Sequence, residues 1–250
     1  MLPPLKSIPE IAETDLFAAS YVKLARAQKF IDKVEAELAR YIADEPTTGF
    51  LDHSANPPAI SIHWKGITLL PGAIAGDAIH NLRTSLDLMA SELARLNGQP
   101  DADVYFPFAA SADKFEGVIK SRNFDRAGDD AVALLRTFAP YRGGNELLRA
   151  LHDLDIQDKH KTLVPTGSAM SFQVQAQYNI DDLTQNQVAV TPLNVRYGFP
   201  DGGILGGRNL VETLKDSMQL THGIVEAFAA LVRKRTSTCG RASPSGADSV

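Results

Sequence analysis

Two stretches of this sequence carry side chains that could do chemistry. Residues 76–87 read GDAIHNLRTSLD, and residues 145–160 read NELLRALHDLDIQDKH. Each places a histidine three residues from an aspartate, Asp77 with His80 and His152 with Asp155. An imidazole next to a carboxylate can act in acid–base catalysis or bind a metal ion. We therefore expect one functional site that both stretches build.

The first hypothesis for this site is a metal centre. Helical bundles hold one or two metal ions with an imidazole and a carboxylate one turn apart on facing helices. Such sites more often use glutamate, and Arg83 and Lys159 would compete for the same carboxylate oxygens. The ion would be divalent iron, zinc or manganese. The expected ligands are Asp77, His80, His152 and Asp155.

The second hypothesis is acid–base chemistry without a metal. A histidine oriented by an aspartate can act as a general base near neutral pH. Arg83 would then hold an anionic group of the substrate or a developing negative charge. The candidate catalytic residues are His80, Arg83, Asp87, His152, Asp155, Asp158, Lys159 and His160.

A third reading makes the same side chains structural. Arg83 stands four residues before Asp87, and Asp155 stands four residues before Lys159. Oppositely charged residues at this spacing pair on a helix, and a buried charge requires such a partner. A buried ion-pair network would therefore contain the same residues as a catalytic site.

The spacing of apolar residues predicts that both stretches are helical. A stripe from Ile79 to Leu96 repeats every three or four residues, which predicts a helix over 70–96. His80, Arg83 and Asp87 fall together on one flank of that helix, and the small residues there would let a second helix approach. In the second stretch Leu147, Leu151 and Leu154 form the expected core stripe, with His152, Asp155 and Lys159 on one flank. We expect the two helices to pack through these polar flanks.

The rest of the chain predicts a mainly α fold of the α+β class. We expect a bundle of four to five helices, with a small antiparallel β hairpin or meander. The helix nearest the N-terminus would begin near Thr14 or Asp15, either of which can cap it, and end before Pro46. Short helices should follow Ser111 and span 129–138, and a long one should span 209–235.

The β element comes from two runs of alternating polarity. Residues 171–178 and 187–197 are strand-like. Residues 46–58 are turn-rich, 59–64 could be a short strand or an extended lead-in, and the VYFPF run at 104–108 is extended.

The order of the predicted elements and the composition of the chain also predict the domain organisation. We expect one domain over 1–235, with the β insertion at about 165–200. A disordered tail over 236–250 would follow it.

Composition narrows the classes of function. The chain has 250 residues, a formal charge of −5 and one cysteine. This balance argues against wholesale binding to nucleic acid and does not provide a disulfide framework. No apolar run is long enough to cross a membrane, and the first residues lack a signal-peptide core. We expect a cytoplasmic protein that binds a small molecule and has no membrane partner.

The two helical stretches resemble the signatures of a broad group of uncharacterised bacterial proteins. In that group a GD-x-x-HNLR-x-x-LDH helix precedes an L-x-x-D-x-x-DKHR helix. The resemblance covers these two helices and, loosely, residues 14–43. This sequence departs from it at Leu88, where a histidine is expected, and at Lys161, where an arginine is expected. The resemblance implies a shared polar site, without an activity, at Asp77, His80, Asn81, Arg83, Asp87, Asp155, Asp158, Lys159 and His160.

The chain is more distantly similar to the HEPN superfamily of helical bundles, many of which are ribonucleases of toxin or defence systems. Their catalytic pattern has an arginine, a polar residue and a histidine four to six positions on. No arginine precedes His160 at that spacing. Arg83 could approach it only through the fold.

These readings give one expected function and two alternatives. We expect an intracellular enzyme, a hydrolase or a metal-dependent enzyme, that acts on a small molecule between the two helices. The alternatives are a HEPN-like ribonuclease or toxin, and a non-catalytic ligand-binding or scaffold protein. The sequence does not predict the substrate, because loops supply the walls of such a pocket.

Overall fold

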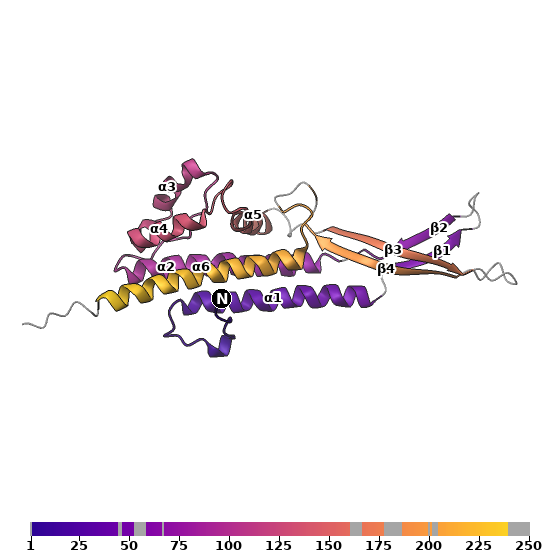
Figure 1. Cartoon of the computed structure of the whole chain (residues 1–250), viewed down its shortest axis with the longest axis horizontal. Coiled ribbons are helices and arrows are strands. Elements are labelled where there is room, and N and C mark those ends of the chain that lie inside the picture. The colour runs from indigo at the N-terminus through magenta and orange to yellow at the C-terminus, as the bar shows by residue number, and fades with distance from the viewer. Residues whose placement is uncertain are drawn as a thin grey trace, which may run out of the picture. The chain divides into compact units, whose positions relative to one another are not determined.

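A computed structural model describes residues 2–44, 47–52, 59–66, 68–160, 167–177, 187–199, 201 and 205–239. The chain divides into two compact units, and the ribbon is drawn in Figure 1. Unit 1 comprises Met1–Lys29, Ala78–Ile156 and Asp216–Val250, and unit 2 comprises Phe30–Asp77 and Gln157–Lys215. None of the described helices is long and apolar enough to cross a membrane.

Helices dominate the described chain, which confirms the mainly α class. Four are long and two have ten residues each. Six α-helices are described, against the expected four to five, and the two ten-residue helices are the short ones predicted after Ser111 and over 129–138. Their bounds are α1 (Ala18–Ala43), α2 (Leu70–Leu96), α3 (Ala112–Ser121), α4 (Asp129–Phe138), α5 (Glu146–His160) and α6 (Leu210–Cys239).

The predicted apolar stripe of α2 lies in the core. Ile79, Leu82 and Leu86 are at most 1% exposed, and Met89 and Leu93 are fully buried. Burial of five large side chains on one face stabilises α2 far more than helix propensity alone would. The stripe ends one residue early, because Leu96 at the end of α2 is 43% exposed.

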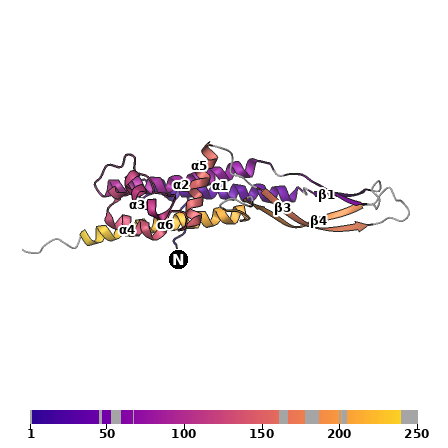
Figure 2. The ribbon, with the colours of Figure 1, turned by 90° about the horizontal axis from the view of Figure 1, so that it is seen from above.

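An aromatic cluster joins the elements of unit 1. Phe106 packs against Phe108 and Phe124, with ring centroids 5.0 and 6.1 Å apart. Phe228 of α6 lies 6.0 Å from both Phe124 and Phe138. Figures 1 and 2 both show α4 beside the C-terminal half of α6, as these contacts require. The VYFPF run is thus an extended segment that covers the core, as predicted.

The first helix begins later than predicted. We expected a start near Thr14 or Asp15, but α1 begins at Ala18. Phe17 has a φ of 58°, which is incompatible with an α-helix, and its backbone N–H donates to Glu92 Oε1 at 3.2 Å. Asp15 instead binds Lys6 at 2.7 Å. The turn before α1 is therefore fixed by tertiary contacts rather than by a helix cap.

Unit 2 contains a four-stranded antiparallel sheet in the order β2-β1-β4-β3. The predicted hairpin forms as β3 (Gly167–Gln177) and β4 (Gln187–Gly198). Residues 59–64 were predicted to be either a short strand or an extended lead-in, and they form strand β2 (Ala59–Trp64). The prediction that 46–58 is turn-rich was wrong for Thr47–Asp52, which forms strand β1. The prolines flanking this run suggested turns, but Thr47–Asp52 pairs with β2 along its whole length.

Pro192 lies inside β4 although it cannot donate a ladder hydrogen bond. Strand β1 pairs with β4 only at Val188 and Gln187, so it does not reach Pro192. On the other side, Pro192 pairs with Phe172, next to a register shift between Ser171 and Phe172. The proline is accommodated where the ladder is already irregular.

The chain's end also differs from prediction. Helix α6 continues to Cys239, so residues 236–239 are helical rather than part of a disordered tail. Arg235 donates to Ala127 O at 2.9 Å and to Asp130 Oδ2 at 2.8 Å. These contacts anchor the last turns of α6 to α4. Residues 240–250 lie outside the described part of the chain.

Candidate functional site

Helices α2 and α5 contact each other through their polar flanks within unit 1, as predicted. His80 Nδ1 lies 3.0 Å from Asp155 Oδ1, and Arg83 Nε donates to His152 Nδ1 at 3.3 Å. Both contacts join one helix to the other, and α5 is seen crossing α2 in Figure 2. The polar flanks are therefore part of a helix–helix interface.

The buried face of α5 is rotated from the predicted one. We expected Leu147, Leu151 and Leu154 to point inward, but Leu147 and Leu154 are only half-buried. Leu148 is fully buried and Leu151 is 3% exposed. Asp155 is also buried, at 5% exposed, and its carboxylate contacts His80 of α2.

His80 and Asp155 form a dyad with one buried and one accessible member. The Asp155 side chain is 7% exposed, whereas the His80 side chain is 43% exposed. A carboxylate only accepts hydrogen bonds, so Nδ1 of His80 donates to it, and in the neutral ring Nε2 is the nitrogen that can accept a proton. The Thr84 hydroxyl lies 3.4 Å from Nε2. A histidine held this way can remove a proton from a water molecule or a substrate.

Phe108 organises the second half of the interface. Its ring stacks on His152 with centroids 4.6 Å apart and planes 9° from parallel. The Arg83 guanidinium carbon lies 4.6 Å from the same ring's centroid. A guanidinium over an aromatic face is attracted by the ring quadrupole. The VYFPF segment thus supplies a platform for two predicted site residues.

Arg83 is committed to neighbours rather than open to a substrate. Its side chain is 11% exposed and forms an ion pair with Asp87 at i,i+4. It also donates to His152 and lies over Phe108. The expected pairing of Arg83 with Asp87 is present, but an anion-binding role for Arg83 would require these contacts to break.

Asp87 anchors the VYFPF segment. Its Oδ1 accepts a hydrogen bond from the Phe106 backbone N–H at 2.9 Å. Burial raises the pKa of Asp87 above its ordinary value, although Arg83 and the Phe106 N–H act in the opposite direction. This position makes Asp87 a structural link between α2 and the core rather than a group that faces a substrate.

His152 is held in its neutral form. Burial, together with the nearby positive charges of Arg83 and Arg149, lowers the pKa of His152 to about 4. Because Arg83 donates to Nδ1, the ring proton lies on Nε2. His152 therefore acts near neutral pH as a hydrogen-bonding group and not as a base.

The protonation of His152 should make stability depend on pH. Its pKa in the folded protein is about 4, below the ordinary 6.5, so the unfolded chain binds this proton more tightly. The contribution to stability is complete above pH 6.5 and is lost as the pH falls from 6.5 to about 4. The difference corresponds to about 3 kcal/mol.

Urea unfolding at pH 7 and pH 4.5 would measure this loss, with His152→Phe as the comparison, since phenylalanine keeps a ring against Phe108. The variant should lose less stability than the wild type between the two pH values. The raised pKa of Asp87 acts in the opposite direction in both proteins, so the comparison cancels it. Equal losses in the two proteins would contradict the assignment.

A second set of charged side chains, Arg142, Arg149 and Asp153, lies on α5 and in the loop before it. Arg149 is 8% exposed, donates to Ala109 O at 3.2 Å and pairs with Asp153 at 2.5 Å. Arg142 also binds Asp153, at 3.0 Å. Arg149 ties α5 to Ala109 at the end of the VYFPF segment, and these arginines were not among the predicted site residues.

The remaining predicted residues belong to unit 2. Asp77 is exposed, and Lys159 is exposed on α5. Within unit 2 the Asp158 carboxylate lies against Gly76 so closely that a Cβ at Gly76 would be 2.5 Å from its oxygens. This close approach is the role expected for a small residue at Gly76. The side chain of His160 lies outside the described residues.

The four residues predicted to bind a metal are not gathered into a shell. Among the residues that the structure describes, no three His, Cys, Asp or Glu side chains lie close enough to hold a metal ion. The reason is the pairing above: His80 faces Asp155, His152 accepts from Arg83, and Asp77 is exposed.

Thr84 and Phe108 are the site residues that sequence reasoning missed. Thr84 follows His80 by four residues, a spacing that places it beside the imidazole on a helix. Phe108 gave no such signal, because only the fold brings its ring to α2 and α5.

No family model matches this chain, and neither curated proteins nor solved structures gave a match.

Proposed function

We propose that this protein is an enzyme that uses His80 as a general base on a small molecule. The observation that carries the proposal is the 3.0 Å contact between His80 Nδ1 and the buried Asp155 carboxylate, with the imidazole itself 43% exposed. Asp155 fixes the ring orientation and the tautomer, and Nε2 is the atom that accepts the proton.

The proposed reaction class is hydrolysis. Nε2 of His80 would take a proton from a water molecule as that water attacks the substrate, and the imidazolium would return the proton to the leaving group. Thr84 Oγ1, 3.4 Å from Nε2, would hold the water or a substrate hydroxyl in line. Neutral His152, with its proton on Nε2, adds a hydrogen-bond donor in the same interface.

A hydrolase screen tests this proposal. Purified protein would be incubated with aryl esters, aryl phosphates and a metabolite extract, and products would be followed by absorbance and mass spectrometry. We expect turnover of at least one substrate that His80→Gln removes. His63→Gln is the matched control, because His63 is an exposed histidine on β2.

The same screen separates the competing functions. Loss of turnover on chelation, with stoichiometric bound metal, would replace the proposal by metal chemistry. Cleavage of RNA that His160→Gln removes would favour a ribonuclease. If no substrate in any arm is turned over, the protein is a binding or scaffold module and the proposal fails.

The state of His80 can be checked without a substrate. Long-range proton–nitrogen NMR spectra distinguish the two neutral tautomers of histidine. We expect neutral His80 to carry its proton on Nδ1, as the contact with Asp155 requires. Asp155→Ala should convert it to the mixture found in unstructured peptides, and an Nε2–H form in the wild type would contradict the proposed role.

A further inference from the structure

A cavity lies in unit 1, and His80 is not among the residues that line it. It has a volume of about 460 Å³, within the range of small-molecule sites. The N-terminal segment, the turn before α1, and α6 form its walls. The lining residues are Pro3, Pro4, Lys6, Thr14, Asp15, Leu16, Tyr21, Glu226 and Arg233.

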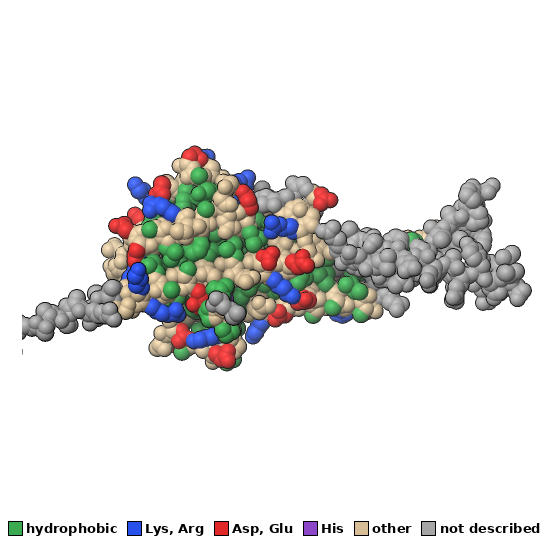
Figure 3. All heavy atoms as spheres, in the orientation of Figure 1, with side chains coloured by type: hydrophobic (Ala, Val, Ile, Leu, Met, Phe, Trp, Pro, Cys, Tyr) green, Lys and Arg blue, Asp and Glu red, His purple; other side chains and the backbone are tan. Residues whose placement is uncertain are grey.

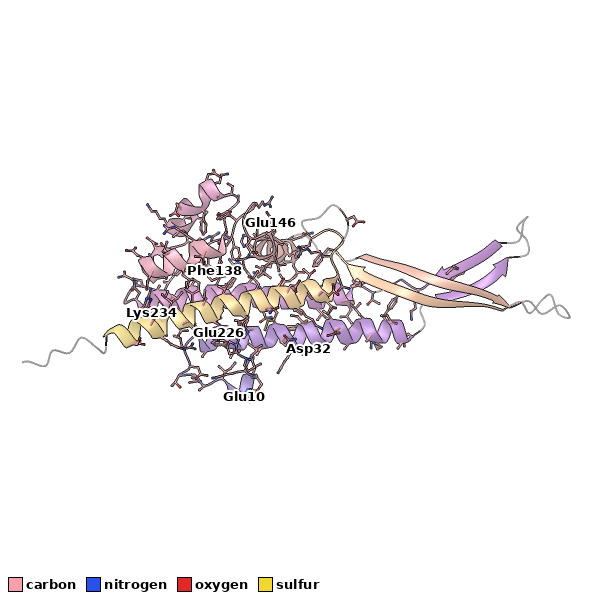
Figure 4. All side chains as sticks on the ribbon, viewed as in Figure 1. Glu10, Asp32, Phe138, Glu146, Glu226 and Lys234 are labelled. Atoms are coloured by element: carbon pink, nitrogen blue, oxygen red, sulfur yellow. The ribbon has the colours of Figure 1, made fainter. Side chains whose placement is uncertain are left out.

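One wall of this cavity is a polar cluster, in which Tyr21 and Glu226 are half-buried and His222 is buried. The Tyr21 hydroxyl donates a short hydrogen bond to Glu226 Oε1. His222 Nε2 lies 3.8 Å from the same carboxylate, and its ring meets Tyr21 edge-on at 6.2 Å. In Figure 4 the labelled Glu226 lies on the side of α6 that faces α1, in agreement with these contacts. Burial lowers the pKa of His222, so its ring adds no positive charge near neutral pH.

The Arg233 guanidinium and the Glu226 carboxylate both line the cavity, and they are near each other without a direct hydrogen bond. Arg233 Nη1 lies 3.9 Å from Glu226 Oε2, beyond the length of a direct hydrogen bond. The Arg233 side chain is 63% exposed, and Glu226 is 17% exposed. By contrast, Lys6 and Asp15 satisfy each other at 2.7 Å. The cavity therefore presents one cation and one anion that a ligand could bridge.

We propose that this cavity binds a small zwitterion, an α-amino acid with an apolar side chain. Its carboxylate would accept from the Arg233 guanidinium, which can bind both oxygens. Its ammonium would donate to Glu226 and lie near the Tyr21 ring. The apolar side chain would lie against Pro3, Pro4 and Leu16.

This ligand matches the charges better than a simple anion or cation does. The four charged lining residues are two basic and two acidic, so a ligand with a net charge would leave one partner unmatched. A zwitterion neutralises Arg233 and Glu226 together.

Calorimetry and NMR with the full chain test this inference. The probes are L-leucine, leucinamide, which lacks the carboxylate, and N-acetyl-leucine, which lacks the ammonium. We expect L-leucine to bind about 10- to 100-fold more tightly than either analogue, the range for losing one charged hydrogen bond. Equal affinity for all three, or no binding of the apolar amino acids at 10 mM, which is about the weak end of specific binding, would overturn it.

Two variants test which side chain binds the carboxylate of the ligand and which binds its ammonium group. Arg233→Gln should remove the preference for leucine over leucinamide, and Glu226→Gln should remove the preference over N-acetyl-leucine. Lys234→Gln is the matched control, because Lys234 is exposed on α6 next to Arg233 and does not line the cavity. Arg233 is exposed, so its variant should fold even if Glu226→Gln does not. Unchanged leucine binding by Arg233→Gln would also overturn the proposal.

A separate apolar groove on the same unit has no such polar pair. Phe138, Leu220, Gly223 and Ile224 line it together with Asp216 and Gln219. Figure 3 shows hydrophobic side chains gathered over α4 and α6 on the viewed face. Leu2 lies near Gly223, at 3.7 Å from a Cβ placed there, so the N-terminal segment passes beside one residue of this groove.

Discussion

His80→Gln is expected to lower kcat/KM of the proposed hydrolysis by about 10²- to 10⁴-fold, the usual contribution of a general base. Glutamine cannot accept a proton from water, whereas the 43% exposed imidazole can. If His80 acts only in the chemical step, the loss should lie in kcat while KM stays near the wild-type value. A steady-state assay on the substrate found by screening would measure both parameters.

Asp155→Asn is the companion test. An asparagine side chain offers Nδ1 of His80 either an amide oxygen or an amide NH₂, so it no longer selects one tautomer. We expect kcat to fall without loss of the folded state. His63→Gln should leave both parameters unchanged. Wild-type kcat in His80→Gln would eliminate the general-base proposal, even if the protein proves to be an enzyme.

The second large effect concerns stability. Asp87→Ala should lower the free energy of unfolding by about 3–5 kcal/mol, the range for removing one partner of a buried ion pair. The substitution leaves Arg83, whose side chain is 11% exposed, without its carboxylate. It also removes the acceptor of the Phe106 N–H, which is 2.9 Å from Asp87. Urea unfolding at pH 7 would measure the loss.

A surface pair provides the control. Glu116 binds Arg136 at 2.8 Å, but the two side chains are 60% and 50% exposed. Water screens such a pair, so Glu116→Ala should leave the unfolding midpoint close to that of the wild type. Asp87→Asn should fall between the two, because its amide oxygen can still accept from Phe106. If Asp87→Ala is as stable as Glu116→Ala, the buried network does not hold this segment.

Sequence predicted the elements where local signals agreed. Helix α4 spans residues 129–138 as predicted, because Pro140 limits it after an amphipathic run. The contact between α2 and α5 was also predicted correctly, because the polar residues share one flank on each helix. The sequence did not predict which face of α5 is buried, because Leu147, Leu148, Leu151 and Leu154 allow two apolar stripes. The fold buries Leu148 and Leu151, together with Asp155, which meets His80.

The site was harder to predict than the fold. Arg83, His152 and Asp155 were named from spacing, but their partners were not all assigned. Arg83 and His152 both lie against Phe108, which is 44 residues before His152 in the chain and stacks on it only after folding. The cavity beside Tyr21 and Glu226 left no sequence signal, because these two residues are 205 positions apart in the chain. Contacts of this kind are set by packing rather than by periodicity.

The three-segment construction of unit 1 has a consequence for how the protein is made. Phe228 of α6 packs against Phe124 and Phe138, so the aromatic cluster lacks a member until synthesis passes that residue. A chain emerging from the ribosome would carry α2, α3 and α4 with Phe124 and Phe138 uncovered during this interval. Exposed aromatic surface on a nascent chain is a site for chaperones and for aggregation. Of the described helices, α6 is synthesised last, and its Phe228 covers Phe124 and Phe138.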